Sequence, residues 1–309
     1  MMGLGRRAHE SHVAMVLPRP SPETFGKDHR LGKGRLSFGF AVSRCPFCLS
    51  TEIRRDGVDN GSQRYRCRKC GRTFNALTGT MLADTRKRQR EWEGFVLSLT
   101  NDATLVASSE YTPINKNTAY RWRIMVFSEL DELVSGIFLY DTVVIDEIFF
   151  DVDKKDRLIK PNGDLPRGLS TDKLAVEVAI DIHGQAYGKV MDRGHPDSGQ
   201  ILSALRGHVA PGSLVIHDDL RGYREAMKGL GVRDVVAKTK EPGSLGLMQP
   251  VNSLCALVRR VAYLHVGEKA KNLQLYVDWA CLRTRLRSFP PKARKRLVLE
   301  MLAGKKFAN

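Results

Sequence analysis

The octapeptide Val-Val-Ile-Asp-Glu-Ile-Phe-Phe, residues 143–150, sets the architecture of the chain around it. Its β-branched and aromatic side chains predict a strand, and its near-continuous apolarity predicts that both faces of this strand are covered. Asp146 and Glu147 interrupt the apolar run, and an ionised carboxylate in such surroundings is costly unless a cation compensates it. Either these side chains lie at an exposed strand end or in a salt bridge, or Asp146 binds a metal ion.

Further strands and helices alternate after this strand. Strands are predicted at residues 174–182, 187–191, 213–217 and 232–237, and helices at residues 198–207, 220–229, from about 251, and at 268–287. The polar segment between residues 151 and 173 is predicted to be a loop or lid, and residues 242–249 a glycine-rich loop. This order is that of an α/β, RNase H-like domain, with a mixed sheet and flanking helices, over residues 140–287.

Asp218, which ends the strand at residues 213–217, is the second candidate acid. In an RNase H-like sheet the first and fourth strands lie side by side, about 4.8 Å apart, so we expect Asp146 and Asp218 to share a metal ion. Because two facing carboxylates repel each other, a divalent cation stabilises the pair, and oxygen ligands favour Mg²⁺ or Mn²⁺. Such a site predicts two-metal phosphoryl transfer. We expect Glu147 to support the metal ligands rather than to bind the ion.

Two C-x-x-C pairs, Cys45-Pro-Phe-Cys48 and Cys67-Arg-Lys-Cys70, are separated by residues 49–66. This spacing predicts a structural four-cysteine zinc site in a ribbon at residues 41–82, because two tight turns can direct four thiolates at one ion. Basic side chains crowd this module, and we expect four of them to contact DNA: Arg64, Arg66, Arg68 and Lys69. The alternative is that these charges form only a solvated surface.

Residues 86–136 show the apolar spacing of helices. A helix from residue 86, a short helix at residues 104–110 and a third helix after Pro113 resemble a helix-turn-helix unit. Its last helix would direct four side chains towards DNA: Lys116, Asn117, Tyr120 and Arg121. The alternative is a helical linker that makes no contact with a groove.

Charge limits the possible partners. Lys and Arg number 50 and Asp and Glu number 34 in 309 residues, a formal net charge of +16, which is typical of a protein that binds a polyanion such as DNA. A membrane-surface role is the weaker alternative. No apolar run approaches the roughly 18 residues of a transmembrane helix, and the N-terminus lacks a secretory signal, which predicts a cytoplasmic protein. We expect residues 1–40 to be a basic, disordered leader and residues 288–309 to be a basic tail. The chain carries no phosphate-binding G-x-x-x-x-G-K-[ST] loop.

Several segments also stand in an order typical of one family. They are residues 64–80, residues 118–123, residues 143–147, Asp218 with Tyr223, residues 251–253 and residues 272–279. Together they resemble an insertion-sequence transposase with an N-terminal zinc ribbon and a DDE-type catalytic domain, and the similarity runs from about residue 42 to residue 287. The resemblance implies that Asp146 and Asp218 are the first two catalytic acids.

The third acidic position of that family has no carboxylate here, because no Asp or Glu occurs between residues 242 and 267. One branch of the family carries Asn with a basic residue seven positions later, which matches Asn252 and Arg259, although Lys is usual at the second position. Seven residues are two helical turns, about 10.5 Å, so both side chains share one face. The resemblance implies that Asn252 offers its amide oxygen to the metal and that Arg259 holds a phosphate. The alternatives are a helix cap for Asn252 and plain surface charge for Arg259.

The expected function is therefore transposition. The ribbon and the helical unit would bind the terminal inverted repeats of the element as double-stranded DNA, with the protein acting as a homodimer or larger assembly on that DNA. The resemblance implies a bacterial or archaeal, nucleoid-associated protein. The missing third acid leaves an alternative, a DNA-binding regulator with a decayed nuclease domain. A structure-specific nuclease that shares the fold is a further alternative.

Overall fold

The computed structural model describes residues 42–59, 61–83, 85, 87, 89–152, 173–238, 243–263 and 272–304. The leader expected at residues 1–40 lies outside these ranges, and so do residues 153–172 of the expected lid. Within the described ranges, no helix combines the length and the apolar character that crossing a membrane requires.

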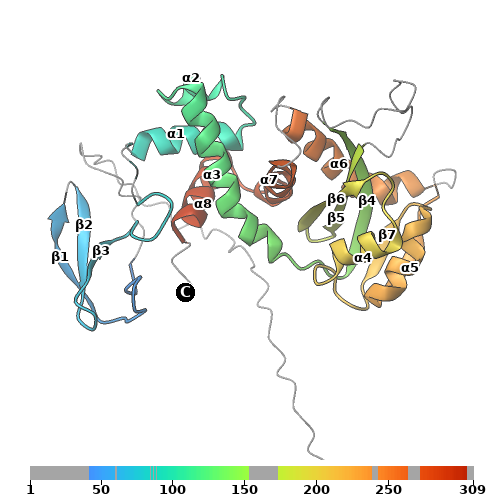
Figure 1. The fold of residues 1–309 in the computed structure, drawn as a ribbon, viewed down its shortest axis with the longest axis horizontal. Helices are drawn as coiled ribbons and strands as arrows, with labels where there is room; N and C mark the ends of the chain where they lie inside the picture. The colour runs from blue at the N-terminus through green and yellow to red at the C-terminus, as the bar shows by residue number, and fades with distance from the viewer. Residues whose placement is uncertain are drawn as a thin grey trace, which may run out of the picture.

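Five strands form the central sheet in the order β6-β5-β4-β7-β8 (Figure 1). Their bounds are β4 Thr142–Asp151, β5 Lys173–Asp181, β6 Ala186–Arg193, β7 Leu214–His217 and β8 Arg233–Val236. β5 is antiparallel to β4 and β6, whereas β7 is parallel to β4 and β8. This mixed sheet confirms the predicted RNase H-like α/β class, and its first and fourth strands are neighbours as expected.

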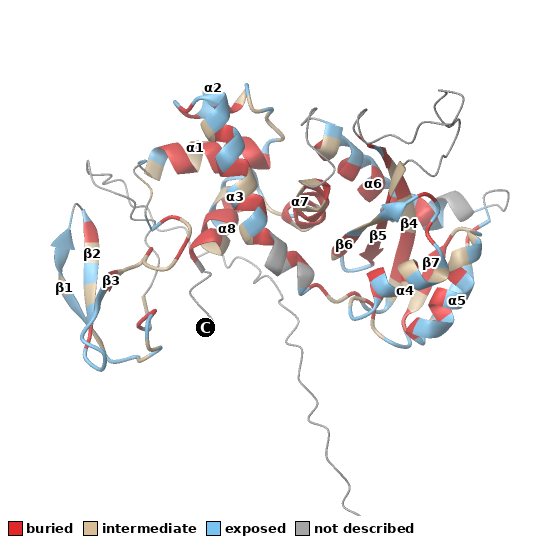
Figure 2. Ribbon diagram, in the orientation of Figure 1, coloured by how far each residue is buried: buried red, intermediate tan, exposed pale blue. Residues whose placement is uncertain are grey.

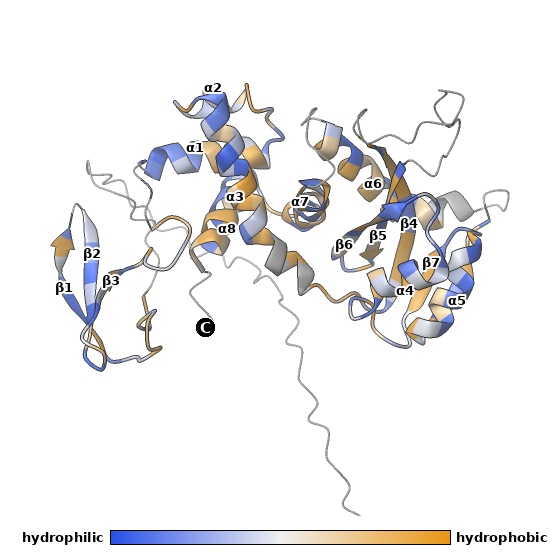
Figure 3. Ribbon diagram, viewed as in Figure 1, coloured by the Kyte–Doolittle hydropathy of each residue, from blue (hydrophilic) through white to orange (hydrophobic). Residues whose placement is uncertain are grey.

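The central position of β4 follows from its apolar sequence. Val143 and Val144 are buried although consecutive strand residues point to opposite faces, and Ile145 and Ile148 repeat the pattern. Figure 2 shows β4 and β5 as buried strands, and Figure 3 shows them as mostly hydrophobic. Both faces of the strand are therefore covered, as the sequence predicts.

Four helices flank the sheet: α4 Ser198–Leu205, α5 Arg221–Leu230, α6 Ser244–Tyr263 and α7 Leu273–Leu286. α5 covers the face to which Glu147 points, because Tyr223 of α5 contacts Glu147. α6 covers the opposite face, because Cys255 of α6 contacts Asp146. α4 packs against α5, and α7 packs against α6 and β6. The sheet is thus the middle layer of three.

Gly188 lets β6 and α7 approach closely. A Cβ atom at this position would lie 2.5 Å from Val277 Cγ1 of α7 and 3.5 Å from the Cys281 sulfur. The side-chain amide of Gln274, also on α7, donates to the Gly188 carbonyl at 2.9 Å and accepts from the Val190 N–H at 2.8 Å. This amide therefore satisfies backbone groups of an edge strand, which would otherwise be open to another chain.

Further helices lie before and after the sheet: α1 Gln89–Thr100, α2 Ser108–Tyr111, α3 Lys116–Ser135 and α8 Pro291–Gly304. Trp92 of α1 stacks on Trp122 of α3 with ring centroids 3.8 Å apart. Further along α3, Phe127 stacks on Trp279 of α7 at 5.1 Å. These contacts join the helices to the sheet through one continuous apolar core.

Helix α8 occupies most of the segment in which the sequence suggested a basic tail. Val298 and Leu302 are fully buried, and Lys295 pairs with Glu93 of α1 at 2.8 Å. Apolar residues at helical spacing lie between the charged residues of this segment. They form a stripe along one side of α8 that packs against α1. Helix α8 is therefore part of the core.

Helix α6 begins at Ser244, whereas the sequence predicted a loop at residues 242–249 and a helix from about residue 251. Pro250 lies inside the helix and has no N–H to donate to the preceding turn. Met248 and Val251 are nevertheless buried, and their burial offsets the lost hydrogen bond. The loop prediction was wrong because it weighted glycine and proline above these apolar side chains.

A small three-stranded ribbon precedes the helices, with strands β1 Ile53–Asp59, β2 Ser62–Cys67 and β3 Thr73–Asn75 in antiparallel order. Its apolar cluster is small and separate from the main core, and contains buried Cys45, Cys67 and Phe74. So small a core does not stabilise a domain alone, and modules of this size usually depend on a metal or disulfides.

Candidate functional site

The carboxylates of Asp146 and Asp218 lie together where β7 ends beside β4. The parallel register pairs Val144 with Ile216. Asp146 and Asp218 each follow two residues later, so the two aspartates lie level with each other. Carboxylate oxygens of Asp146, Glu147 and Asp218 all lie within 4.8 Å of one another, and the three residues are half-buried. The structure thus brings together the two acids that the sequence singled out, and adds Glu147 to them.

The early end of β7 makes this arrangement possible. β7 pairs with residues 142–144 of β4 and stops at His217, whereas β4 continues to Asp151. Beyond this pairing, no strand in the described part of the chain adjoins β4 on its β7 side. Asp218 follows there, and its Oδ1 accepts the N–H of Leu220 at 3.0 Å as the chain turns into α5.

The electrostatics of the three carboxylates favour a bound cation. Burial raises the pKa of Asp146, and the charge of Asp218 raises it further. The same two causes raise the pKa of Glu147 to about 7. Because each ionised carboxylate destabilises the others, a divalent cation would stabilise all three. An all-oxygen donor set of this kind fits Mg²⁺ or Mn²⁺.

Helix α6 lies against this group of acids. The buried Cys255 sulfur is 3.7 Å from Asp146 Oδ2. Arg259, one turn further along, is exposed, and its charge partly opposes the rise in the pKa of Asp146 that burial and Asp218 cause. Asn252 precedes Cys255 by about one turn and is also exposed. The helix-cap alternative for Asn252 is wrong, because this residue lies inside α6 rather than at its start.

A buried tyrosine links Glu147 to a second glutamate that the sequence analysis missed. Glu177 of β5 stands opposite Glu147 in the antiparallel register and is fully buried. The hydroxyl of Tyr223, itself fully buried, lies 3.0 Å from Glu147 Oε2 and 3.2 and 3.3 Å from the Glu177 oxygens. Burial raises the pKa of Glu177 well above its usual range, and the charge of Glu147 adds to this. The sequence signal that could have identified Glu177 is its position as an acid within the otherwise apolar run of residues 174–180.

His217 supports the backbone beside Asp218. Its ring is buried, its Nδ1 bonds to the Asp218 carbonyl oxygen, and its Nε2 lies 3.3 Å from Asp234 Oδ2 of β8. The ring also lies 4.8 Å from that of Tyr223. This side chain therefore fixes the end of β7, and with it the position from which Asp218 extends.

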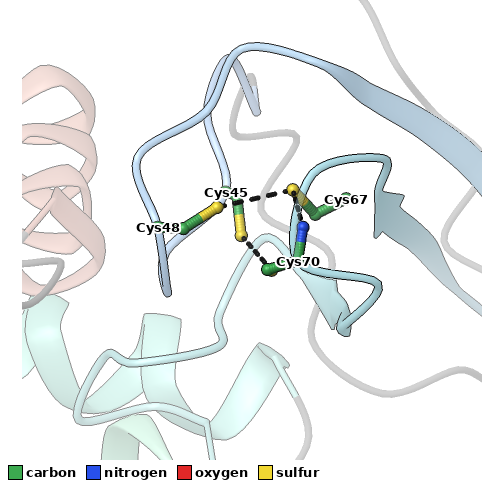
Figure 4. Close-up of side chains that lie close together, drawn as sticks. All are labelled: Cys45, Cys48, Cys67 and Cys70. Carbon is green, nitrogen blue, oxygen red and sulfur yellow. Dashed lines mark hydrogen bonds between the residues drawn. The ribbon is translucent and has the colours of Figure 1, made fainter.

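The four ribbon cysteines form a second, closed group (Figure 4). Sγ of Cys45 is 3.6 Å from Sγ of Cys70, Sγ of Cys48 is 3.5 Å from Sγ of Cys67, and all four sulfurs lie within 4.8 Å of one another. Zinc–sulfur bonds of about 2.3 Å place tetrahedral sulfurs about 3.8 Å apart. The Cys70 N–H donates to Cys67 Sγ and lowers the pKa of that thiol to about 6. The donor set and its spacing fit structural zinc.

One face of the ribbon is lined with arginine. Arg54 of β1 stands directly opposite Arg66 of β2, and Arg64 lies two residues from Arg66 on the same face. Asp56 is their local counter-charge, 3.4 Å from Arg64 and 3.5 Å from Arg66. Like charges directly opposite each other destabilise a sheet, so this face favours a polyanion. The other two predicted DNA contacts, Arg68 and Lys69, are exposed between Cys67 and Cys70.

Helix α3 presents the predicted recognition residues to solvent. Asn115 caps the helix, accepting the N–H of Thr118 at 2.8 Å. Ala119 and Trp122 face the core, while four other side chains of the first turns are exposed: Lys116, Asn117, Tyr120 and Arg121. The guanidinium of Arg123 is fully buried and donates to the Ala103 carbonyl at 3.0 Å, which ties α3 to the loop after α1.

No protein-family model matches the sequence, and a search of curated proteins finds no match. Solved structures show distant similarity. A chain of the simian T-cell lymphotropic virus intasome in complex with PP2A regulatory subunit B56 gamma is 16% identical, with 47% of this chain and 49% of that chain covered and a TM-score of 0.32. The catalytic core domain of BIV integrase is 13% identical over 46% and 80%, with a TM-score of 0.29. A pre-cleavage Mos1 transpososome is 10% identical over 75% and 85%, with a TM-score of 0.26.

The protein thus spans about half the length of the intasome chain. TM-scores of this size do not indicate a function.

Proposed function

We propose that this protein is an insertion-sequence transposase that binds terminal inverted repeats and catalyses metal-dependent DNA strand cleavage and strand transfer. The observation that supports this proposal is the convergence of Asp146 and Asp218, far apart in the chain, on one point of an RNase H-like sheet. A carboxylate within the otherwise apolar strand β4 destabilises the fold unless a cation compensates it. A cation shared with Asp218 would offset that cost and explains why Asp146 is present.

The chemistry follows from the residues at that point. Bound Mg²⁺ or Mn²⁺ would activate the attacking oxygen and stabilise the leaving oxygen of a phosphodiester. Asp146 and Asp218 would hold the cation from two neighbouring strands, so their separation is fixed by the sheet. Asn252 would add a neutral amide oxygen from α6, and Arg259, on the same helix, would hold a substrate phosphate. Water would first hydrolyse a phosphodiester at the element end and leave a 3′-hydroxyl. This hydroxyl would then attack a phosphodiester of the target DNA and displace the 3′-oxygen of the target strand, which leaves as a hydroxyl.

DNA binding would use the two basic surfaces that precede the sheet. The arginine face of the zinc ribbon suits phosphates, and the exposed start of α3, carrying Asn117 and Arg121, suits base edges in a major groove. Two element ends must meet during transposition, so we propose that the protein acts as a homodimer or larger assembly on DNA. We also propose that the protein is bacterial or archaeal and associates with the nucleoid.

Single-residue variants of the acidic pair test the proposal. Asp146→Asn and Asp218→Asn should abolish cleavage of a duplex carrying the inverted repeats that flank the gene, in Mg²⁺, without weakening binding of that duplex. Asp219→Asn is the matched control, because Asp219 is exposed and adjacent to Asp218. Undiminished cleavage by either site variant would remove the catalytic assignment. Joining of the cleaved end to a second duplex distinguishes a transposase from a structure-specific nuclease.

The absence of a carboxylate on α6 near the site favours one alternative, a zinc-ribbon DNA-binding regulator whose nuclease domain has decayed. In that case the wild-type protein would bind the repeats through the ribbon and α3 but leave them intact in Mg²⁺ and in Mn²⁺. Single-turnover cleavage of end DNA by the purified wild-type protein would exclude the regulator.

A further inference from the structure

The proposed cation site is short of oxygen ligands. Mg²⁺ and Mn²⁺ prefer six oxygen ligands, whereas the proposed function gives the cation only two carboxylate ligands, Asp146 and Asp218. Asn252 offers at most a neutral oxygen, and it lies exposed on α6. The Glu147 carboxylate, in contrast, has an oxygen within 4.8 Å of those of both aspartates.

Consecutive strand residues normally cannot bind one ion, because their side chains point to opposite faces of the sheet. Asp146 does point towards α6 and Glu147 towards α5. Asp218, however, lies in line with β7, beyond the end of that strand and beside β4. A cation held by Asp218 would be within reach of Asp146 from one face of the sheet and of the longer side chain of Glu147 from the other.

Tyr223 fixes the orientation of Glu147. Its phenol ring is fully buried, so its hydroxyl has little freedom to choose a partner. The hydroxyl has one hydrogen, and Glu147 Oε2, at 3.0 Å, is nearer than either oxygen of Glu177. Glu177 and Tyr223 are both fully buried, whereas Glu147 is half-buried, so Glu147 is the one of these three residues that is accessible to solvent. Glu147 is thereby held at the open side of this group, next to Asp218.

We infer that Glu147 is the third carboxylate ligand of the divalent cation held by Asp146 and Asp218, and that Tyr223 is the residue that positions it. This inference rests on the proposed metal-dependent function and adds a ligand to the same site. It also explains how a protein without an acid on α6 can supply three carboxylates. Tyr223 itself touches neither cation nor DNA in this arrangement and acts through Glu147.

Mn²⁺ binding tests the inference without requiring activity. The zinc-loaded full-length chain is titrated with Mn²⁺ at one fixed pH, and free Mn²⁺ is followed by its electron paramagnetic resonance signal. Glu147→Gln keeps the size of the side chain and removes its charge, and Tyr223→Phe keeps the buried ring. Matched controls are Glu225→Gln, on the exposed side of α5, and Tyr276→Phe, a buried tyrosine of α7.

Glu147→Gln should weaken Mn²⁺ binding at least about tenfold, and Tyr223→Phe should weaken it about tenfold, as for other residues that orient a ligand. The controls should stay within about twofold of the wild type. In a Glu147→Gln background the Tyr223→Phe change should have little further effect, because the carboxylate that Tyr223 positions is already gone. If Tyr223 had only a structural role, Tyr223→Phe would lower stability in both backgrounds, and its effect on Mn²⁺ affinity would not depend on Glu147.

The outcomes separate the inference from the function on which it rests. Wild-type affinity in both Glu147→Gln and Tyr223→Phe, with binding lost in Asp146→Asn, would overturn the inference and leave the proposed function standing. An equal loss from Tyr223→Phe in both backgrounds would overturn the positioning role. A wild-type protein that binds no Mn²⁺ beyond its ribbon metal would overturn the proposed function together with the inference.

Discussion

Replacing the arginines on one face of the ribbon should make the DNA affinity of the protein less sensitive to salt. Arg54, Arg64 and Arg66 lie on one face of β1 and β2, and Asp56 sits among them. The triple Arg→Gln variant removes three positive charges and keeps the polar side chains. It leaves the cysteines and the apolar cluster of the ribbon unchanged, so the fold should persist.

The expected size follows from counterion release. Each phosphate contact contributes about 0.9 to the slope of log K against log salt, so three arginines contribute about 2.7. Raising KCl fourfold should therefore cost the wild type about 40-fold more affinity than the triple variant loses. Asp56→Asn should act in the opposite direction, because it frees two arginines from exposed ion pairs worth roughly 1 kcal/mol together. Its DNA affinity should rise up to about fivefold.

Fluorescence anisotropy with a labelled duplex, measured over a series of KCl concentrations, gives these slopes directly. Arg55→Gln is the control on the ribbon itself, because Arg55 stands opposite Tyr65 on the other face of β1 and β2. Its slope should stay close to that of the wild type. Two results would refute the proposal that this face contacts DNA phosphates. One is a triple variant whose slope of log K against log salt equals that of the wild type, and the other is an Asp56→Asn variant that binds DNA more weakly than the wild type.

Three further predictions concern stability. Cys67→Ser should abolish stoichiometric zinc and make residues 42–75 sensitive to limited proteolysis, while the main thermal transition stays in place, because the ribbon cluster is separate from the main core. The pKa of Glu147 is about 7 in the folded chain against an ordinary 4.5, so the folded state holds the proton more tightly than the unfolded state. Without added Mg²⁺, the free energy of unfolding should therefore fall by at most about 3 kcal/mol as pH rises from about 4.5 to about 7; Glu147→Gln should flatten this dependence in urea titrations at several pH values. Gly188→Ala should cost about 1–3 kcal/mol in urea unfolding, since its Cβ would meet Val277, and adding Val277→Ala should recover part of that loss.

Several features were predictable because they depend on neighbouring residues. The apolar run of residues 143–150 produces a covered central strand, and the two C-x-x-C pairs bring four sulfurs together. The helix from residue 116 begins where a break after Pro113 suggested, with Asn115 as its cap. Helix α8 was not recognised, because its many basic residues obscured an apolar stripe that is buried against α1 and α3.

The amino-acid sequence alone determined the strands of the central sheet, most helices, the cysteine group and the two candidate aspartates, since periodicity and spacing are local properties. Only the tertiary structure decided that Glu147 joins those aspartates and that Tyr223 lies between Glu147 and Glu177. The physical reason is register: the pairing of β4 with β5 and β7, and the early end of β7, set which side chains meet. No pattern within a single segment carries that information, because each of these contacts joins residues from different strands or from a strand and a helix.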